Sequence, residues 1–208
     1  MEGLLGEVDA AFVATGAGLD PWPSPRPFLA APAEEEYSRV TNPERWRIVS
    51  ARAEAWEVTF ETLGIAVVER GVRSRWVDGD PSIVSRVDRV VPTAAGALPI
   101  LVARTTAGGV SDFGVMLGFG DPAASVLVLP LCGCDACDGG SSYELEELDE
   151  FMLDIVSGVY RQTRDQGGRR YWGRNRSGSG GSVEGVSYDL SGAPWIETTG
   201  SWHRGPSR

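Results

Sequence analysis

Two stretches of the chain repeat apolar residues at every third or fourth position, which is typical of helices that bury one face. The first stretch follows Pro43 and the second follows Ser141. Because about 3.6 residues complete one helical turn, this spacing gathers the apolar side chains into a stripe that faces a core. The predicted stripes contain Trp46, Val49, Ala53, Trp56, Phe60 and Leu63 in the first helix, and Leu145, Leu148, Met152, Ile155, Val156 and Val159 in the second.

Residues suited to capping stand at the start of both predicted helices. Thr41 and Glu44 have the spacing of a capping box, and Asn42 is the alternative cap for the same helix. Ser141 and Glu144 repeat the capping-box spacing at the second helix. The sequence therefore predicts that side chains at these positions bind the free amides of the first helical turn.

Between the two helices the apolar period changes to two, which indicates strands. Alternating segments cover residues 65–77, 83–91, 98–105, 110–119 and 125–131. The connections between them are short and rich in Gly, Asp and Pro, and short connections favour antiparallel neighbours. We therefore predict an α+β fold, in which two main helices pack on an antiparallel meander of four to five strands.

Composition divides the chain into four parts. Residues 1–33 include a proline-rich arm, because five prolines between positions 16 and 33 prevent regular helix or central strand. Residues 34–162 form the predicted α+β core. Residues 163–185, rich in Arg, Gly and Ser, are predicted to be a flexible connector. Residues 186–208 are an aromatic tail, which we expect to dock on the core.

Net charge separates the body of the chain from one basic segment. The formal charge is −10 at pH 7, whereas the segment Arg161 to Arg176 carries six arginines against one aspartate. A surface this acidic repels phosphate backbones and anionic membranes. We therefore expect a basic protein partner and no membrane association. If nucleic acid is bound at all, the sequence points to the basic segment, where Tyr171 and Trp172 lie among the arginines.

Missing residue types exclude several kinds of chemistry. All 19 Lys and Arg residues are arginine, which excludes a lysine Schiff base and a P-loop. His203 is the single histidine, so a site built from two histidines is excluded as well. The sequence contains no nucleophile elbow and no Gly-rich nucleotide loop. It therefore favours a binding protein over an enzyme.

The pattern of the chain also bears on its location. The longest apolar run, residues 126–131, is far shorter than the roughly 20 residues that cross a bilayer. The first residues are acidic, whereas a signal peptide begins with positive charge. The cysteines are clustered, unlike those of a secreted disulfide framework. We therefore expect a cytoplasmic protein.

All three cysteines, Cys132, Cys134 and Cys137, lie within six residues of one another, and three interpretations of them remain open. They could be reduced thiols that fill space in a tight turn between a strand and a helix. They could bind zinc, which prefers four tetrahedral ligands and has a high affinity for thiolates. They could also be redox-active, because Cys134 and Cys137 have the spacing of a dithiol pair.

The zinc interpretation needs a fourth ligand. Asp138 and His203 are the candidates for this position, together with Asp135 or a water molecule. No second pair of cysteine or histidine ligands occurs elsewhere in the chain. For this reason we expect structural thiols at the turn of an interaction domain, with zinc or redox chemistry as the alternative function.

Two segments together resemble a known family. The first is YSRVTNPERW, residues 37–46, and the second is LPLCGCDACD, residues 129–138. They resemble a family of bacterial proteins of unknown function, and the resemblance spans roughly residues 37 to 203. In that family a helix, a sheet, a cysteine-containing turn, an acidic helix and a tryptophan-containing tail follow one another. The resemblance implies a shared architecture and supplies no activity.

Overall fold

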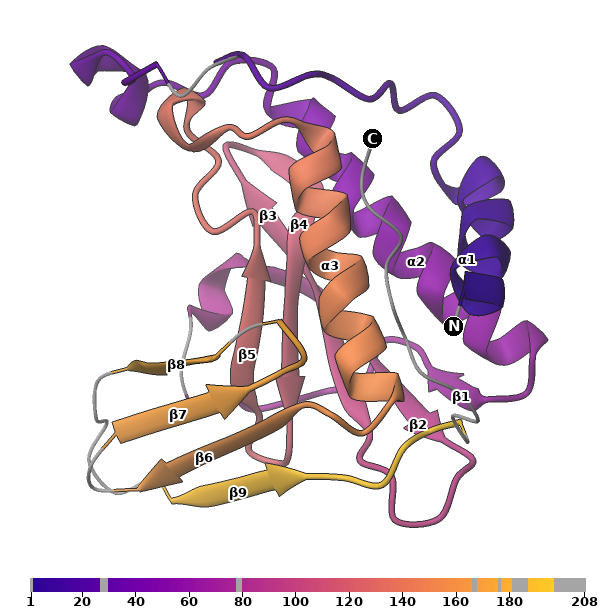
Figure 1. Ribbon diagram of the computed structural model, residues 1–208. Coiled ribbons are helices and arrows are strands. Elements are labelled where there is room, and N and C mark those ends of the chain that lie inside the picture. Colours follow the sequence, from indigo (N-terminus) through magenta and orange to yellow (C-terminus); the bar gives the residue numbers. More distant parts are fainter. Residues whose placement is uncertain are drawn as a thin grey trace.

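A computed structural model describes residues 2–26, 30–77, 80–165, 168–175, 177–180 and 187–196. Its centre is a five-stranded antiparallel sheet in which each strand pairs with the next along the chain (Figure 1). The predicted α+β fold and meander are confirmed. The strands are β1 (Ala66–Glu69), β2 (Val84–Pro92), β3 (Ile100–Ala107), β4 (Val110–Phe119) and β5 (Ala124–Leu129).

The main core lies between one face of this sheet and the helices. Facing pairs such as Ile100 with Phe119 and Val102 with Leu117 are buried on that face. Alternate residues, among them Leu101 and Met116, form a smaller cluster on the opposite face. This arrangement follows from the period of two along a strand, which sends successive side chains to opposite faces of a sheet.

The smaller cluster is covered by the chain that follows β1. Trp76 packs there and forms a single parallel bridge with Ala123. Gly118 of β4 permits the close approach, because a Cβ atom at this position would lie 2.3 Å from the Trp76 ring. The alternating pattern of residues 65–77 predicted one long strand, whereas β1 occupies only its first part.

Both predicted helices are present and cover the sheet. They are α2 (Arg47–Thr62) and α3 (Ser141–Val156), and α2 packs on β4. Most of the predicted apolar stripes are buried, but Leu63 and Val159, which lie just beyond the two helices, are exposed. No helix among the described residues combines the length and apolarity needed to cross a membrane.

A further helix, α1 (Glu2–Thr15), was not predicted. It packs along α2, on the side away from α3 (Figure 1). Of its residues, Leu4 and Val8 are buried, and Gly3 and Gly6 interrupt its apolar face. The helix therefore carries almost no periodic signal, and its packing on α2 compensates for its weak helix propensity.

The predicted capping boxes are wrong. A short 3₁₀ turn (Pro43–Trp46) precedes α2, and its N-cap, Asn42, has a left-handed backbone with no side-chain cap. The N-cap of α3 is Gly140, which has no side chain to offer. Thr41 and Ser141 instead make contacts with distant parts of the chain, because tertiary partners compete with local capping for the same hydroxyl groups.

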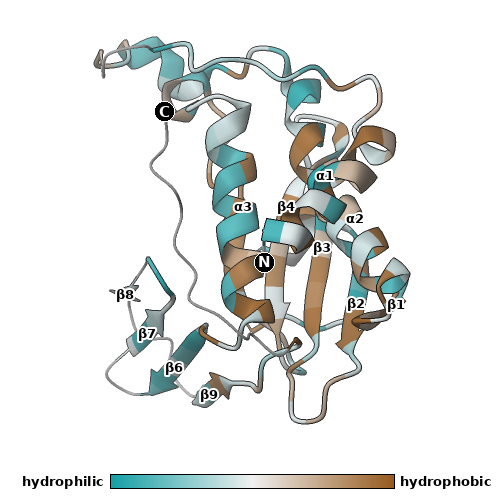
Figure 2. Cartoon of the chain, turned by 45° about the vertical axis from the view of Figure 1, so that its right-hand side comes forward, coloured by the Kyte–Doolittle hydropathy of each residue, from teal (hydrophilic) through white to brown (hydrophobic). Residues whose placement is uncertain are grey.

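A second antiparallel sheet follows α3. Its order is β8-β7-β6-β9, and it lies beside the C-terminal end of α3 (Figure 1). Part of it occupies the segment predicted as a connector, where strands were not expected because polar and Gly residues replace the alternating apolar pattern. Figure 2 shows this contrast between hydrophilic β6 and β7 and hydrophobic β3 and β4. The strands are β6 (Arg161–Asp165), β7 (Gly168–Trp172), β8 (Ser177–Gly180) and β9 (Tyr188–Ser191).

The end of the described chain returns to the main core. Trp195 is 4% exposed, and its ring centroid lies 5.2 Å from that of Phe60 in α2. Its backbone amide donates a hydrogen bond to the carbonyl of Val156, at 2.8 Å. The chain after β9 is thereby attached to both main helices.

Candidate metal centre

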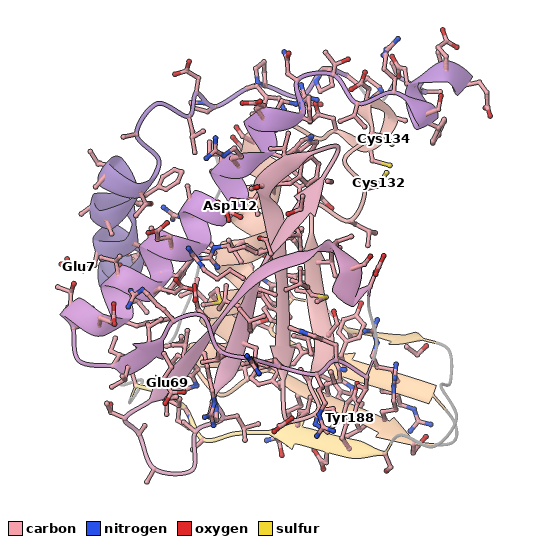
Figure 3. The ribbon with its side chains drawn as sticks, turned by 180° about the vertical axis from the view of Figure 1, so that it is seen from behind. Glu7, Glu69, Asp112, Cys132, Cys134 and Tyr188 are labelled. Carbon is pink, nitrogen blue, oxygen red and sulfur yellow. The ribbon has the colours of Figure 1, made fainter. Side chains whose placement is uncertain are left out.

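The three cysteines lie on the connection between β5 and α3. The strand ends at Leu129, a short 3₁₀ turn spans Asp135–Cys137, and α3 begins at Ser141. Figure 3 shows Cys132 and Cys134 at the opposite end of the molecule from Tyr188 in the second sheet. The expected position of the thiols at a strand-to-helix turn is therefore observed.

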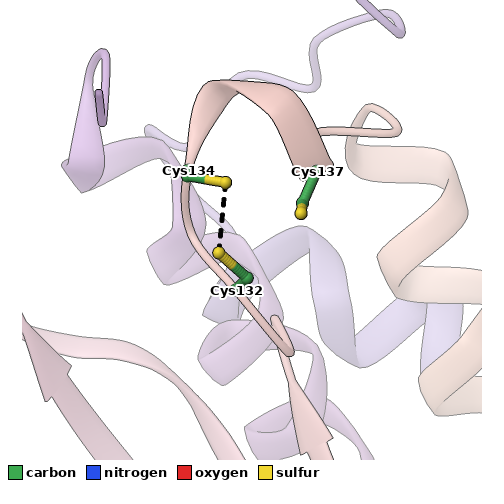
Figure 4. A group of neighbouring side chains, drawn as sticks. All are labelled: Cys132, Cys134 and Cys137. Atoms are coloured by element: carbon green, nitrogen blue, oxygen red, sulfur yellow. Dashed lines mark hydrogen bonds between the residues drawn. The ribbon is translucent and has the colours of Figure 1, made fainter. Parts of the chain in front are cut away.

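The three sulfur atoms converge. Each Sγ lies within 4.8 Å of the other two, and those of Cys132 and Cys134 are 3.1 Å apart (Figure 4). Cys134 is buried, whereas Cys132 and Cys137 are exposed. The turn thus presents three thiols to one small volume that is open to solvent on one side.

The turn also shifts the acidities of its thiols. Burial alone would raise the pKa of Cys134, but hydrogen bonds from the Cys132 thiol and from the amides of Cys137 and Ala136 outweigh it and lower this pKa. The hydrogen bond between Cys137 and Cys134, together with burial, raises the pKa of Cys137 to about 11. A lowered pKa favours the thiolate, which is the form of cysteine that binds a metal.

Asp135 attaches the turn to the segment that precedes α2. Its carboxylate accepts hydrogen bonds from the amide and hydroxyl of Thr41, each at 2.7 Å, and from Nε of Arg39, at 2.6 Å. Burial acts to raise the pKa of Asp135, but these donors prevail and lower it to about 2. Thr41, predicted as a helix cap, is therefore a partner of the cysteine turn.

Asp138 holds the turn to the proline-rich arm. Its side chain is 1% exposed and lies 2.7 Å from Nη2 of Arg45. Nε1 of Trp22 and the amide of Gly140 donate hydrogen bonds to it, at 2.9 and 2.8 Å. Asp138, a candidate fourth ligand, thus contacts three protein donors, and the candidate His203 lies outside the described residues.

Aromatic contacts reinforce this attachment. The guanidinium of Arg45 lies over the rings of Trp22 and Trp46, at 5.1 and 5.4 Å from their centroids. The two tryptophan rings meet edge to face, with centroids 5.3 Å apart. Cation–π contacts of one guanidinium with both rings favour a fixed position for the arm. The contacts of Trp22, Arg39 and Arg45 with the turn were not predicted.

The contacts of the turn join the two segments that carry the family resemblance. Arg39, Thr41 and Arg45 belong to residues 37–46, and both aspartates belong to residues 129–138. The distinctive motifs of the two segments were the only indication in the sequence that these residues matter. A single sequence does not show that two distant segments are in contact.

A comparison with protein families gave a match. A family model described as a family of unknown function, DUF6226, matches residues 8–203. The chain belongs to the DUF6226 family. The match confirms the resemblance to a family of unknown function, and it begins within α1, before the range expected from the two segments. Neither the curated proteins nor the solved structures gave a match.

The described arginines of the basic segment differ in exposure in this DUF6226 protein. Arg161 and Arg170 are exposed on β6 and β7, whereas Arg164 is buried. The guanidinium of Arg169 lies over the Tyr171 ring, 5.9 Å from its centroid. One face of this ring is therefore in contact with an arginine of the same sheet. Arg176 lies outside the described residues.

Proposed function

We propose that the turn containing Cys132, Cys134 and Cys137 binds a thiophilic metal ion, and that this ion is Zn²⁺. The supporting observation is the convergence of the three sulfur atoms within 4.8 Å. Tetrahedral zinc with bonds of about 2.3 Å to sulfur needs sulfurs about 3.8 Å apart. The Cys132 and Cys134 sulfurs, 3.1 Å apart, would move apart by about 0.7 Å, and no pair would need to close by more than about 1 Å, which changes of thiol rotamer can supply.

Exposure supports a metal over packing alone. Thiols that serve only to fill space belong in the interior, but Cys132 and Cys137 are exposed. The lowered pKa of Cys134 also favours a thiolate, which packing does not require. Three ligands from one turn leave a fourth position for water, for His203, or for Asp138 if it exchanges one of its present partners.

The role proposed for the ion is structural. The ion would stiffen the turn. Through its residues Asp135 and Asp138, this turn binds the segments around Trp22 and Arg45. We propose that the resulting surface belongs to a non-enzymatic interaction domain. The net charge of the whole chain, −10, favours a basic partner protein. A cytoplasmic location, where thiols stay reduced, fits such a site.

The test is metal analysis of untagged protein purified under reducing conditions. We expect about one Zn²⁺ per chain, and we expect Cys134→Ser to lose it, because removal of one of three thiolates leaves too few ligands. Replacement of zinc by Co²⁺ should give a thiolate-to-metal charge-transfer band that the variant lacks. Ala136→Ser, which adds a hydroxyl to the same turn and keeps all thiols, is the matched control and should retain the metal.

The outcomes separate the alternatives. Three titratable thiols without bound metal would contradict the proposal and return the cysteines to a packing role. Loss of two thiols on mild oxidation, with a disulfide between Cys132 and Cys134, would instead support redox chemistry, since these sulfurs are already 3.1 Å apart.

A further inference from the structure

A pocket of about 460 Å³ lies next to the cysteine turn. One wall is the edge strand β5, a second is the first half of α3, and a third is β7 of the second sheet. Cys132 and Cys137 border the pocket, whereas Cys134 does not. The pocket is large enough for a small organic group, because ligand sites in proteins begin at about 300 Å³.

Glu144 is the unusual residue in this pocket. It is 4% exposed, and no group among the described residues donates a hydrogen bond to its Oε2 atom. A buried carboxylate without a partner is costly, so such groups in native proteins need a specific explanation. Rotation about the last side-chain bond can present either oxygen to the pocket that Glu144 lines.

The other charges around the pocket leave Glu144 uncompensated. Burial raises the pKa of Glu144 to about 7, and the carboxylates of Asp138 and Glu147 add to this rise because they repel its negative form. Arg169 is the cation among the lining residues, but it lies over Tyr171 and donates to the carbonyl of Ser125, at 3.4 Å. A positive group placed in the pocket would relieve this repulsion.

The walls suit a cation that carries an apolar body. Side chains of β5 and Phe151 give an apolar surface, and Leu131 stands exposed at the border. The rings of Tyr143 and Tyr171 also line the pocket, and aromatic faces attract ammonium groups. Apolar and aromatic walls around the buried Glu144 carboxylate, with Glu147 also lining the pocket, are the complement of an alkylammonium ion.

We propose that this pocket binds the alkylammonium group of a ligand, with Glu144 as its hydrogen-bonding counter-ion. The ammonium donates to the Glu144 carboxylate, and the alkyl chain lies against β5 and Phe151. The pocket is distinct from the metal site proposed at the three cysteines, although Cys132 and Cys137 border both. A free amine and a lysine side chain of a basic partner offer the same chemistry.

The experiment is an NMR titration of the full chain with hexylamine at about pH 8, where the carboxylate is ionised and the amine is protonated. 1-Hexanol and hexanoate serve as neutral and anionic probes of equal length. We expect saturable shifts of amides along β5 and α3 with hexylamine and much weaker binding of the other two. Equal binding of hexanol would overturn the proposal, because it would show an apolar pocket without selection for a cation.

Two substitutions of opposite sign test the electrostatic argument. Glu144→Gln keeps the shape and should weaken hexylamine binding about tenfold or more, as expected for loss of a hydrogen bond to a charged group. Arg169→Gln should strengthen binding a few-fold, because it removes a repelling charge. Glu146→Gln changes the same charge on the exposed face of α3 and should leave binding unchanged. Unchanged binding in Glu144→Gln, with its melting temperature intact, would contradict the proposal.

Two further arms identify the source and separate the two sites. A short blocked peptide with one lysine should displace hexylamine if the natural ligand is a protein side chain, and the same peptide with norleucine should not. Displacement by free amines alone indicates a small-molecule ligand. Cys134→Ser should lose the metal and still bind hexylamine, whereas Glu144→Gln should keep the metal, so failure of one proposal is distinguishable from failure of the other.

Discussion

Glu144 is a buried carboxylate in the first turn of α3. Its position in the first turn of α3 predicts a carboxylate stabilised by the helix dipole and by capping. In the structure it is buried, and Asp138 and Glu147 repel its charge. Burial and repulsion together outweigh the effect of the helix dipole on the pKa of Glu144. The position of Glu144 in the sequence therefore did not predict its environment.

The raised pKa of Glu144 predicts a specific dependence of stability on pH. An acid whose pKa rises on folding, here from 4.5 to about 7, holds its proton more tightly in the folded state. The free energy of unfolding therefore falls as pH rises through this window and levels off above it. Glu144→Gln should remove this contribution and be more stable than the natural chain above about pH 7, by up to about 3 kcal/mol.

Denaturant unfolding of both proteins at a series of pH values measures the effect. Burial raises the pKa of Glu57 to about 7, although Arg104 opposes this rise. Glu57 is present in both proteins, so its contribution to the pH dependence of stability is the same in both. The difference between the two profiles therefore isolates Glu144. Parallel profiles from pH 4 to 8 would show that its carboxyl is not perturbed.

At the scale of elements, the cysteine turn depends on a segment far away in sequence. Local rules gave its position, because Gly, Asp and Cys residues between a strand and a helix predict a tight turn. They did not give its partners. Trp22, Arg39 and Arg45 reach it over a separation of about a hundred residues, which no local periodicity encodes.

Asp138→Ala tests this attachment. The change removes the acceptor for Trp22 and the Gly140 amide and leaves Arg45 without its closest carboxylate. Loss of one member of a buried ion pair typically costs about 3–5 kcal/mol, and loss of a group that supports metal ligands weakens metal binding by about 10- to 100-fold. We expect both effects, measured by denaturant unfolding and by competition with a zinc chelator.

The matched control for this change is Asp121→Ala. The side chain of Asp121 is 82% exposed and lies 3.9 Å from Arg75, so its removal should change the free energy of unfolding by less than about 0.5 kcal/mol. A variant at position 138 that matched this control in both stability and metal affinity would show that the turn does not need the arm.

At the scale of the whole molecule, Trp195 packs the last described part of the chain against the main helices. This side chain links the last described residues to α2 and α3 and lies in the main core. Trp195→Ala should therefore lower the free energy of unfolding by about 3–5 kcal/mol, the usual cost of removing a large buried aromatic.

Trp172→Ala provides the comparison, because Trp172 is 44% exposed at the end of β7 and should cost much less. Both variants can be compared by denaturant unfolding with fluorescence and circular dichroism as probes. Equal losses for the two tryptophans would indicate that the chain after β9 contributes little to the core.

The sequence by itself determined the central sheet, its two main helices and the position of the cysteine turn. These features follow from local periodicity, since buried faces repeat every two residues in a strand and every 3.6 in a helix. It did not reveal α1 or the second sheet. Their apolar patterns are too weak to be recognised without the surfaces on which they pack.

Only the tertiary structure decided what the turn and the pocket contain. The three sulfurs converge in a turn whose residues Asp135 and Asp138 accept hydrogen bonds and ion pairs from distant segments. Glu144 is buried beside a pocket that β5, α3 and the second sheet line. Contact and desolvation arise between segments that are remote along the chain. For that physical reason the chemistry of this protein lies beyond the patterns that a single sequence displays.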